Sequence, residues 1–153
     1  MKRVFVYAMM VALLASFACM CYADTDDDIK ELASKAAALI KKDDKAKGVA
    51  EIMNPNGPLS AIFKKGKHNV AGNDFDGINI VNRSFPAIAG QNHYTLQDAN
   101  GKCFIKDAIE IAKTKGGGWI EFAWTDPDTK KIGSWRGWVQ RVEGMGLVWK
   151  PKQ

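Results

Sequence analysis

The sequence offers few sets of side chains that could carry out catalysis. His68 and His93 are its only histidines, and neither has a second histidine or a pair of cysteines at the spacing of a zinc site. Ser134 lacks the flanking glycines of a strained nucleophile turn. Because no nucleophile can be matched with a general base and no metal ligands form a set, we expect a protein that is not an enzyme and uses no metal and no cofactor.

Two short motifs look like binding loops but fit better as turns between elements. The run Lys113-Thr114-Lys115-Gly116-Gly117-Gly118 is rich in glycine like a phosphate loop, but it follows a helix pattern and lacks a final Gly-Lys-Ser/Thr. Asp74 and Asp76 are spaced like the start of a calcium loop, yet no acidic residue stands at the twelfth position. We therefore predict a helix stop at the first motif and a hairpin turn at the second.

Tryptophans near the end of the sequence are its strongest chemical signal. The five are Trp119, Trp124, Trp135, Trp138 and Trp149. Arg136 stands two residues before Trp138 on a predicted strand, so both side chains are expected on one face. A guanidinium beside indole rings suits a small carboxylate, which an arginine can hold through two hydrogen bonds. The alternatives are that the indoles fill the core and that Arg136 lies on the surface.

The composition is that of one ordinary globular domain. The chain has 153 residues, of which 46% are hydrophobic and 25% charged. It has no run of about 20 apolar residues, which excludes a protein with several membrane spans. The net charge of +5 comes from lysines that are scattered or mixed with acidic residues. Since a nucleic-acid surface needs clustered cations and stacking aromatics, we expect no nucleic-acid partner.

The first 23 residues have the pattern of a signal peptide. A short cationic start, Met1-Lys2-Arg3, precedes an apolar run over residues 4–18 and the small-residue site Cys21-Tyr22-Ala23. We predict cleavage after Ala23, a single domain over residues 24–153 and a periplasmic location. An acylated lipoprotein is an alternative, although bulky Phe17 makes the segment before Cys19 a poor lipoprotein site. Cleavage would leave Cys103 as the one cysteine, without a partner for an internal disulfide.

The rest of the sequence alternates between helix and strand patterns. Apolar residues recur at three and four positions over residues 24–42, 44–53 and 104–115, which predicts three helices. Extended patterns cover residues 68–73, 77–82, 119–124 and 134–142, and a last strand begins at residue 147. Along the fourth strand, Trp135 and Val139 are expected on one face, with Arg136 and Trp138 on the other. This order predicts an α+β fold with an antiparallel sheet.

Six short motifs in this order resemble those of the bacterial single Cache domain, an extracytoplasmic PAS-like sensor module. The resemblance covers roughly residues 30–150. The motifs are Asn54-Pro55-Asn56-Gly57-Pro58, Asp74-Phe75-Asp76-Gly77, Ile88-Ala89-Gly90-Gln91-Asn92, Asp98-Ala99-Asn100-Gly101-Lys102-Cys103-Phe104-Ile105, Gly117-Gly118-Trp119-Ile120-Glu121-Phe122-Ala123-Trp124 and Trp138-Val139-Gln140-Arg141-Val142. The resemblance implies a long N-terminal helix packed on a five-stranded antiparallel sheet, with a ligand pocket between the sheet and the loop and helix that cover it.

The resemblance also implies a ligand and the residues that would hold it. Family ligands are usually small organic acids or amino acids. By position, the pocket would be lined by Asn82, Arg83, Phe85, Trp124, Arg136 and Trp138. Asn82-Arg83 stands where the family has His-Pro, Trp138 replaces a tyrosine and Trp135 replaces a lysine. Because of these departures, Trp135 and Trp138 could instead fill the pocket.

These patterns lead to two functional hypotheses. The first is a periplasmic ligand-binding sensor domain for a small carboxylate or amino acid, acting in signal transduction or chemotaxis through a separate membrane partner. The second is a protein–protein interaction module whose pocket is filled by tryptophan and which docks on a receptor or forms a homodimer without ligand. Dimerisation that does not depend on a ligand would distinguish the second from the first.

Overall fold

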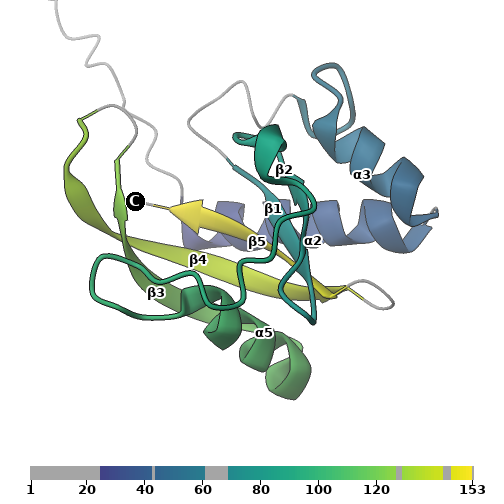
Figure 1. Cartoon of the computed structure of the whole chain (residues 1–153). Helices are drawn as coiled ribbons and strands as arrows, with labels where there is room; N and C mark the ends of the chain where they lie inside the picture. Colours follow the sequence, from purple (N-terminus) through teal and green to yellow (C-terminus); the bar gives the residue numbers. More distant parts are fainter. Residues whose placement is uncertain (1–24, 43, 61–68, 127–128, 143–145, 153) are drawn as a thin grey trace, which may run out of the picture.

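A computed structural model describes residues 25–42, 44–60, 69–126, 129–142 and 146–152. The predicted signal peptide, residues 1–23, lies outside the described residues. The elements follow in the order α2 (Asp26–Lys42), α3 (Lys45–Met53), β1 (Ala71–Asp74), β2 (Asn79–Asn82), the short helix η1 (Pro86–Ile88), α5 (Phe104–Lys115), β3 (Gly117–Thr125), β4 (Ile132–Val142) and β5 (Gly146–Lys152) (Figure 1).

The strands form one antiparallel sheet in the order β2-β1-β5-β4-β3. Helices α2 and α3 cover one face, which we call the α2 face. Helix α5 and the connection over residues 83–103 cover the other, which we call the α5 face (Figure 1). The predicted α+β class with an antiparallel sheet is confirmed. Each face of the sheet has its own hydrophobic cluster, so the sheet is the middle of three layers.

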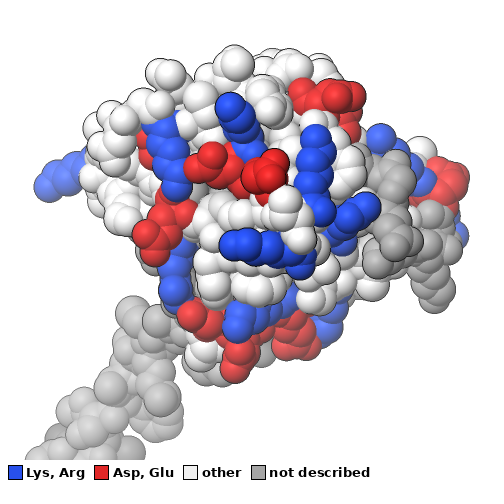
Figure 2. Space-filling view, turned by 90° about the horizontal axis from the view of Figure 1, so that it is seen from below, with Lys and Arg blue, Asp and Glu red and all other residues white. Residues whose placement is uncertain are grey.

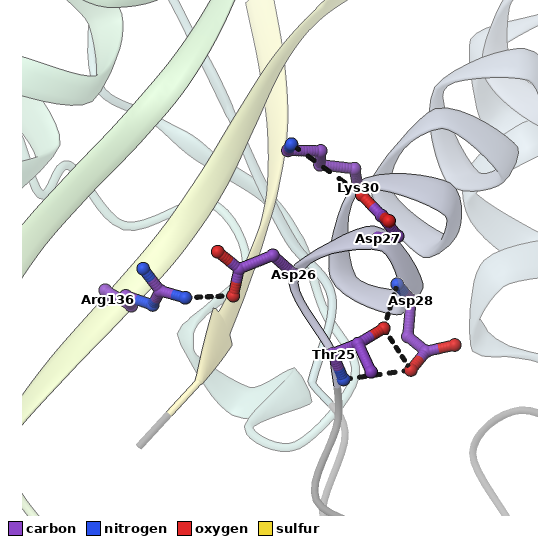
Figure 3. Close-up of polar contacts among 6 residues, drawn as sticks. All are labelled: Thr25, Asp26, Asp27, Asp28, Lys30 and Arg136. Carbon is purple, nitrogen blue, oxygen red and sulfur yellow. Dashed lines mark hydrogen bonds and ion pairs between the residues drawn. The ribbon is translucent and has the colours of Figure 1, made fainter.

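Helix α2 begins at a cap that its sequence supplies. The Thr25 hydroxyl accepts from the backbone N–H of Asp28 at 3.2 Å, and the Asp28 carboxylate accepts from the Thr25 N–H at 2.9 Å (Figure 3). This reciprocal arrangement satisfies donors that the first turn of a helix leaves free. From Ile29 onward, apolar residues at three- and four-residue spacing are fully buried on the α2 face, among them Leu32 and Ala36. The predicted helix is confirmed, although it begins at Asp26 rather than at Asp24.

Helix α5 spans residues 104–115, as the sequence pattern predicts. Its buried stripe packs on the inner residues of β3 and β4 and consists of Phe104, Ile105, Ala108, Ile109 and Ala112. Gly116 ends the helix with a φ of +75°, a conformation that glycine adopts without steric cost. The chain then passes into β3 without a separate loop.

Two predicted boundaries near this helix are wrong. Gly117 and Gly118 are not part of the helix stop, because they pair with Gln140 and Val139 as the first residues of β3. A β-carbon at Gly118 would lie 2.9 Å from a side-chain carbon of Ile111, so the glycine allows α5 to lie close to the strand it leads into. Strand β5 begins at Gly146, one residue before the predicted start, and pairs as far as Lys152.

Candidate functional site

The strand register divides the predicted site residues between the two faces of the sheet. Trp119 pairs with Trp138, whereas Trp124 pairs with Gly133 five residues further along β3. Trp138 and Arg136 lie on the α2 face, and Trp124 lies on the α5 face with Trp135. The predicted alternation along β4 is therefore confirmed. The prediction that Trp124, Arg136 and Trp138 line one pocket is wrong. Trp119 pairs with Trp138 and shares its face, and Trp124 is an odd number of residues from Trp119 along β3, so its side chain lies on the opposite face.

On the α2 face, Arg136 is engaged by the chain itself. Its guanidinium forms an ion pair with the carboxylate of Asp26, in the first turn of α2 (Figure 3). The same guanidinium lies 4.4 Å from the ring centre of Trp119, which meets Trp138 edge-on at 5.4 Å. The sequence analysis predicts that Arg136, beside indole rings, binds the carboxylate of a ligand. In the structure, the carboxylate of Asp26 takes that position beside Arg136.

Arg83 also points away from the α5 face. Its guanidinium donates to the carbonyl oxygens of Ile52 and Asn54, the latter at 3.3 Å, at the end of helix α3. A cation at this position is favourable because the last carbonyls of a helix carry partial negative charge. The structure therefore places Arg83 as a cap of α3, separate from Asn82, whose side chain lies on the α5 face opposite Ala71.

Aromatic rings form a continuous wall at one end of the α5 face. Phe104 stacks on Phe122 with ring centres 4.7 Å apart and meets Trp124 edge-on at 5.5 Å. The indole N–H of Trp135 donates to the carbonyl oxygen of Trp124 at 3.2 Å. Trp124 is 37% exposed, although it is a large apolar side chain. This wall could contact the apolar part of a small ligand.

Asn82 brings a buried polar group to the same face. The residue is 7% exposed, and its Oδ1 accepts from Asn69 Nδ2 at 3.1 Å and from the Phe85 N–H at 2.9 Å. Among the described residues, its Nδ2 donates to no protein acceptor. Phe85, 53% exposed, follows at the start of η1. The structure thus brings Asn82 and Phe85 together and leaves one amide donor available to a ligand.

Two further residues of this face were missed by the sequence reasoning. Asn69 holds the turn after β2, because its Oδ1 accepts from the Ser84 N–H at 3.0 Å while its Nδ2 holds Asn82. Asn69 lies two residues before Ala71 in an extended segment, and this spacing in the sequence indicates that the two side chains share a face. Trp135 was considered only as a pocket filler. Trp138, the other residue considered for that role, lies on the α2 face and cannot fill a site on the α5 face.

The connection over residues 83–103 crosses the α5 face and is fastened to the outer edge of β3 (Figure 1). The buried Asp98 carboxylate accepts from the N–H groups of Ala123 at 2.8 Å, Asn100 at 2.8 Å and Lys102 at 2.9 Å. The Ala99 N–H donates in turn to the Ala123 carbonyl at 3.1 Å. The backbone hydrogen bond from Ala123 is the largest of the causes that lower the pKa of Asp98 below its ordinary 3.8.

This lowered pKa gives a stability that depends on pH. Because the folded pKa lies below the unfolded one, Asp98 stabilises the fold fully above the unfolded pKa, and this contribution is lost as pH falls through the folded pKa. Urea unfolding between pH 7 and pH 3 should therefore show a steeper loss of stability in the wild type than in Asp98→Asn. Asp76→Asn, which changes an exposed carboxylate, is the control and should keep the wild-type slope. Equal slopes for the wild type and Asp98→Asn would contradict this assignment.

Charges on the surface around α5 are of both signs. Seen from below the view of Figure 1, Lys and Arg side chains lie among Asp and Glu side chains (Figure 2). One such contact joins Lys102 to Asp107 at 3.5 Å. Within the described part of the chain, no three His, Cys, Asp or Glu side chains gather as a metal site would require. None of the described helices is long and apolar enough to cross a membrane.

Solved structures with this fold include sensor domains of chemotaxis proteins. One, described as the structural basis for carboxylic acid recognition by a Cache chemosensory domain, has a TM-score of 0.66 at 13% identity and covers 99% of this chain and 97% of that one. The periplasmic sensor domain of a chemotaxis protein has a TM-score of 0.60 at 16% identity, with 82% and 91% covered. A methyl-accepting chemotaxis protein from Vibrio parahaemolyticus gives 0.56 at 20% identity, with 82% and 84% covered.

At these identities the structural likeness establishes the fold alone. No curated protein matches the sequence. The family assignment rests on the sequence itself, because one family model matches most of the chain. That match extends over residues 28–148, and the chain therefore belongs to the Cache domain family.

Proposed function

We propose that this chain is a periplasmic sensor domain that binds a small carboxylate or amino acid on the α5 face and acts through a separate membrane partner. In this proposal residues 1–23 are the signal peptide and residues 24–153 the single Cache domain. The observation that carries the proposal is the amide of Asn82. The residue is more than nine-tenths buried, and its Nδ2, which keeps contact with solvent, donates to no described residue.

Among the described residues, Asn79 Oδ1 is the fully buried side-chain polar atom without a hydrogen-bond partner, so the Asn82 Nδ2 still reaches solvent. A ligand oxygen would take the place of a water at this donor. Asn82 is well suited to this role because its Oδ1 is fixed by two hydrogen bonds, which leave its Nδ2 in a set orientation. A carboxylate oxygen is a strong acceptor for such a donor. The Cache domain described for carboxylic acid recognition, which shares this fold, supports the same ligand class.

The aromatic wall lies too far from Asn82 for one small ligand to contact both. Strands β2 and β3 are opposite edges of the sheet, and four strand spacings of about 4.8 Å separate them by about 19 Å. Trp124 also lies six residues along β3 from Gly118, the residue in the same row as Asn82.

Trp124 and Phe85 are among the few large apolar side chains that are exposed in the described residues. Of these two, Phe85 lies beside Asn82, since its N–H donates to the Asn82 Oδ1, so we keep Asn82 and Phe85 as proposed ligand contacts and leave out Trp124. Arg83 and Arg136 would each have to leave a protein partner to bind a ligand. Charge pairing by either arginine therefore has no support from their positions.

The test is a thermal-shift titration of the exported chain with acetate, propionate and L-alanine, read by tryptophan fluorescence. A ligand that binds only the folded state raises the midpoint of unfolding by mass action. We expect a rise of several degrees at millimolar concentrations for at least one probe. No shift with any probe would overturn the proposal and favour the interaction module with its filled pocket.

Two variants locate the site. Asn82→Asp keeps the oxygen that holds Asn69 and Phe85 but replaces the donor with a second oxygen, so its affinity for the bound probe should fall at least about tenfold. Arg136→Gln, on the α2 face, should bind within about threefold of the wild type. The opposite pattern, with binding lost in Arg136→Gln and kept in Asn82→Asp, would place the ligand on the α2 face.

A further inference from the structure

Asn79 carries a buried hydrogen-bond acceptor that the fold leaves unused. The residue is 3% exposed and lies on β2, opposite Asn73 on β1. Its Nδ2 donates to the carbonyl oxygen of Gly72 at 3.3 Å. Because that carbonyl can only accept, the amide must turn its Oδ1 away from it. Among the described residues, this Oδ1 is the fully buried side-chain polar atom without a hydrogen-bond partner.

A β-bulge brings this acceptor to the α5 face. The pairing of β1 with β2 shifts between Gly72 and Asn73, which leaves Ile80 as the extra residue on β2. Ile80 packs against the hydrophobic cluster of the α2 face. Asn79 lies opposite Asn73, two residues along β1 from Ala71, which belongs to the cluster of the α5 face. Bulges are frequent beside functional sites, where they redirect a side chain.

Asn79 and Asn82 lie on the same face of the same two strands, one row apart. Asn82 pairs with Ala71, and Asn79 pairs with Asn73, two residues further along β1. Two residues of a strand span about 7 Å, and a hydrogen bond at each end takes up about 2.8 Å. The spacing therefore suits one small molecule with an acceptor for the Asn82 Nδ2 at one end and a donor for the Asn79 Oδ1 at the other.

The connection that follows β2 covers Asn79 from the outer edge of the sheet. The Asn79 N–H donates to the Gln91 carbonyl at 2.8 Å, and the Asn79 carbonyl accepts from the Gly90 N–H at 2.8 Å. Because the Oδ1 is closed off from solvent, a ligand must displace part of this cover to reach it. Helix η1, just before Gly90, buries none of its side chains, so it opens at a lower free-energy cost than packed segments do.

The surroundings favour a neutral donor over an ammonium group. The buried polar side chains of β1 and β2 are the amides of Asn73, Asn79 and Asn82, and none of them carries a charge. An ammonium group buried among these amides would lose its hydration without gaining a counter-charge. A hydroxyl group loses far less on burial and can donate to the same amide oxygen.

We propose that the ligand is a small 2-hydroxycarboxylate, whose carboxylate accepts from the Asn82 Nδ2 and whose hydroxyl donates to the Asn79 Oδ1. This inference rests on the proposed function, since it names the ligand class within the same site. A ligand bound in this way satisfies the acceptor that the fold leaves unused. A carboxylate without the hydroxyl satisfies only Asn82, so the site discriminates between two acids that differ by one oxygen atom.

Propionate and lactate are the matched probes, because lactate differs from propionate only by its hydroxyl. Isothermal titration calorimetry of the exported chain gives the dissociation constant of each probe. The better-bound enantiomer of lactate should bind at least about tenfold more tightly than propionate, since propionate leaves the buried acceptor unpaired. L-alanine, in which an ammonium group replaces the hydroxyl, should bind more weakly than lactate.

Each other result of this comparison is decisive. If propionate or L-alanine binds as tightly as lactate, the assignment of a hydroxyl to Asn79 is overturned, while the proposed function stands. If none of the three probes binds, the proposed function fails and this inference fails with it.

Two asparagine variants test the acceptor itself. Asn79→Ala removes the Oδ1 and should bring the affinities for lactate and propionate within about threefold of each other. Asn73→Ala is the matched control, because the Asn73 Nδ2 also donates to a backbone carbonyl, that of Gly77, at 3.3 Å. It should keep the wild-type preference for lactate. Since the preference is a ratio within one variant, a general loss of affinity does not imitate the result.

A full preference for lactate in Asn79→Ala, or its loss in both variants alike, would overturn the role of the Asn79 Oδ1. Asn79→Val, whose side chain suits a strand, replaces Asn79→Ala if that variant does not fold. The comparison of lactate with propionate in the wild type depends on neither variant.

Discussion

Phe104→Ala is expected to lower the free energy of unfolding by about 3–5 kcal/mol, the cost of removing a fully buried aromatic ring. Phe104 is 3% exposed and stacks on Phe122 across the interface between α5 and β3. It is also the ring that Trp124 meets edge-on. The variant therefore removes part of the core and the support of the aromatic wall together. Urea unfolding followed by circular dichroism measures the effect.

Phe104→Leu is the matched control, because leucine retains most of the buried apolar volume. Its cost should be below about 1.5 kcal/mol. At that cost the fold stays intact, so probe binding can be compared directly with the wild type. If Phe104→Ala costs less than about 1 kcal/mol, the ring is not what holds α5 against the sheet, and our description of this core is incorrect.

Gly77→Ala, in the turn between β1 and β2, should lower the free energy of unfolding through two separate costs. Gly77 has a φ of +88°, where a residue with a β-carbon costs about 1–2 kcal/mol. That β-carbon would also lie 2.6 Å from the Cβ and 2.8 Å from the backbone nitrogen of Tyr94, and overpacking of this kind adds about 1–3 kcal/mol. Tyr94 belongs to the connection that crosses the α5 face, and the preceding His93 N–H donates to the Gly77 carbonyl at 2.9 Å.

Gly90→Ala separates the two costs. Gly90 has a similar φ of +84°, but nothing lies within 4 Å of the β-carbon that alanine would add. It should therefore lose only the conformational part, about 1–2 kcal/mol. Urea unfolding of both variants gives the difference. Equal losses of stability would mean that the connection shifts to make room for the new methyl group. The close contact between Gly77 and Tyr94 would then not contribute to stability.

The sequence was sufficient for the elements whose patterns are local. The stripe of α5 is visible in its apolar spacing, and the alternation along β4 predicts that Trp135 and Arg136 point to opposite faces. Both predictions are confirmed. The observed boundaries of elements differ from the predicted ones where pairing with a strand distant in the sequence determines them. Gly117 and Gly118 have poor strand propensity, but β4 supplies their partners, which is a tertiary effect that no local pattern contains.

The candidate site was predicted less well, because its membership depends on register. Placing Trp124 beside Trp138 required knowing which residues of β3 and β4 pair. The actual register puts Trp119 opposite Trp138 and leaves Trp124 opposite Gly133. The two arginines were assigned to a ligand because their charge suggested an anionic partner. That partner proved to be internal for each: the carboxylate of Asp26 for Arg136 and the carbonyls ending α3 for Arg83.

The strand order determines when during synthesis the sheet can be completed. Strand β5 is the last of the five to leave the ribosome, yet it lies in the middle of the sheet, between β1 and β4. Until it arrives, β1 and β4 have no partner on their inner edges, and the sheet is two separate hairpins. Neither hairpin has enough strands to be stable alone. The sheet is therefore completed only after the whole chain has been synthesised, which is compatible with the export that we propose.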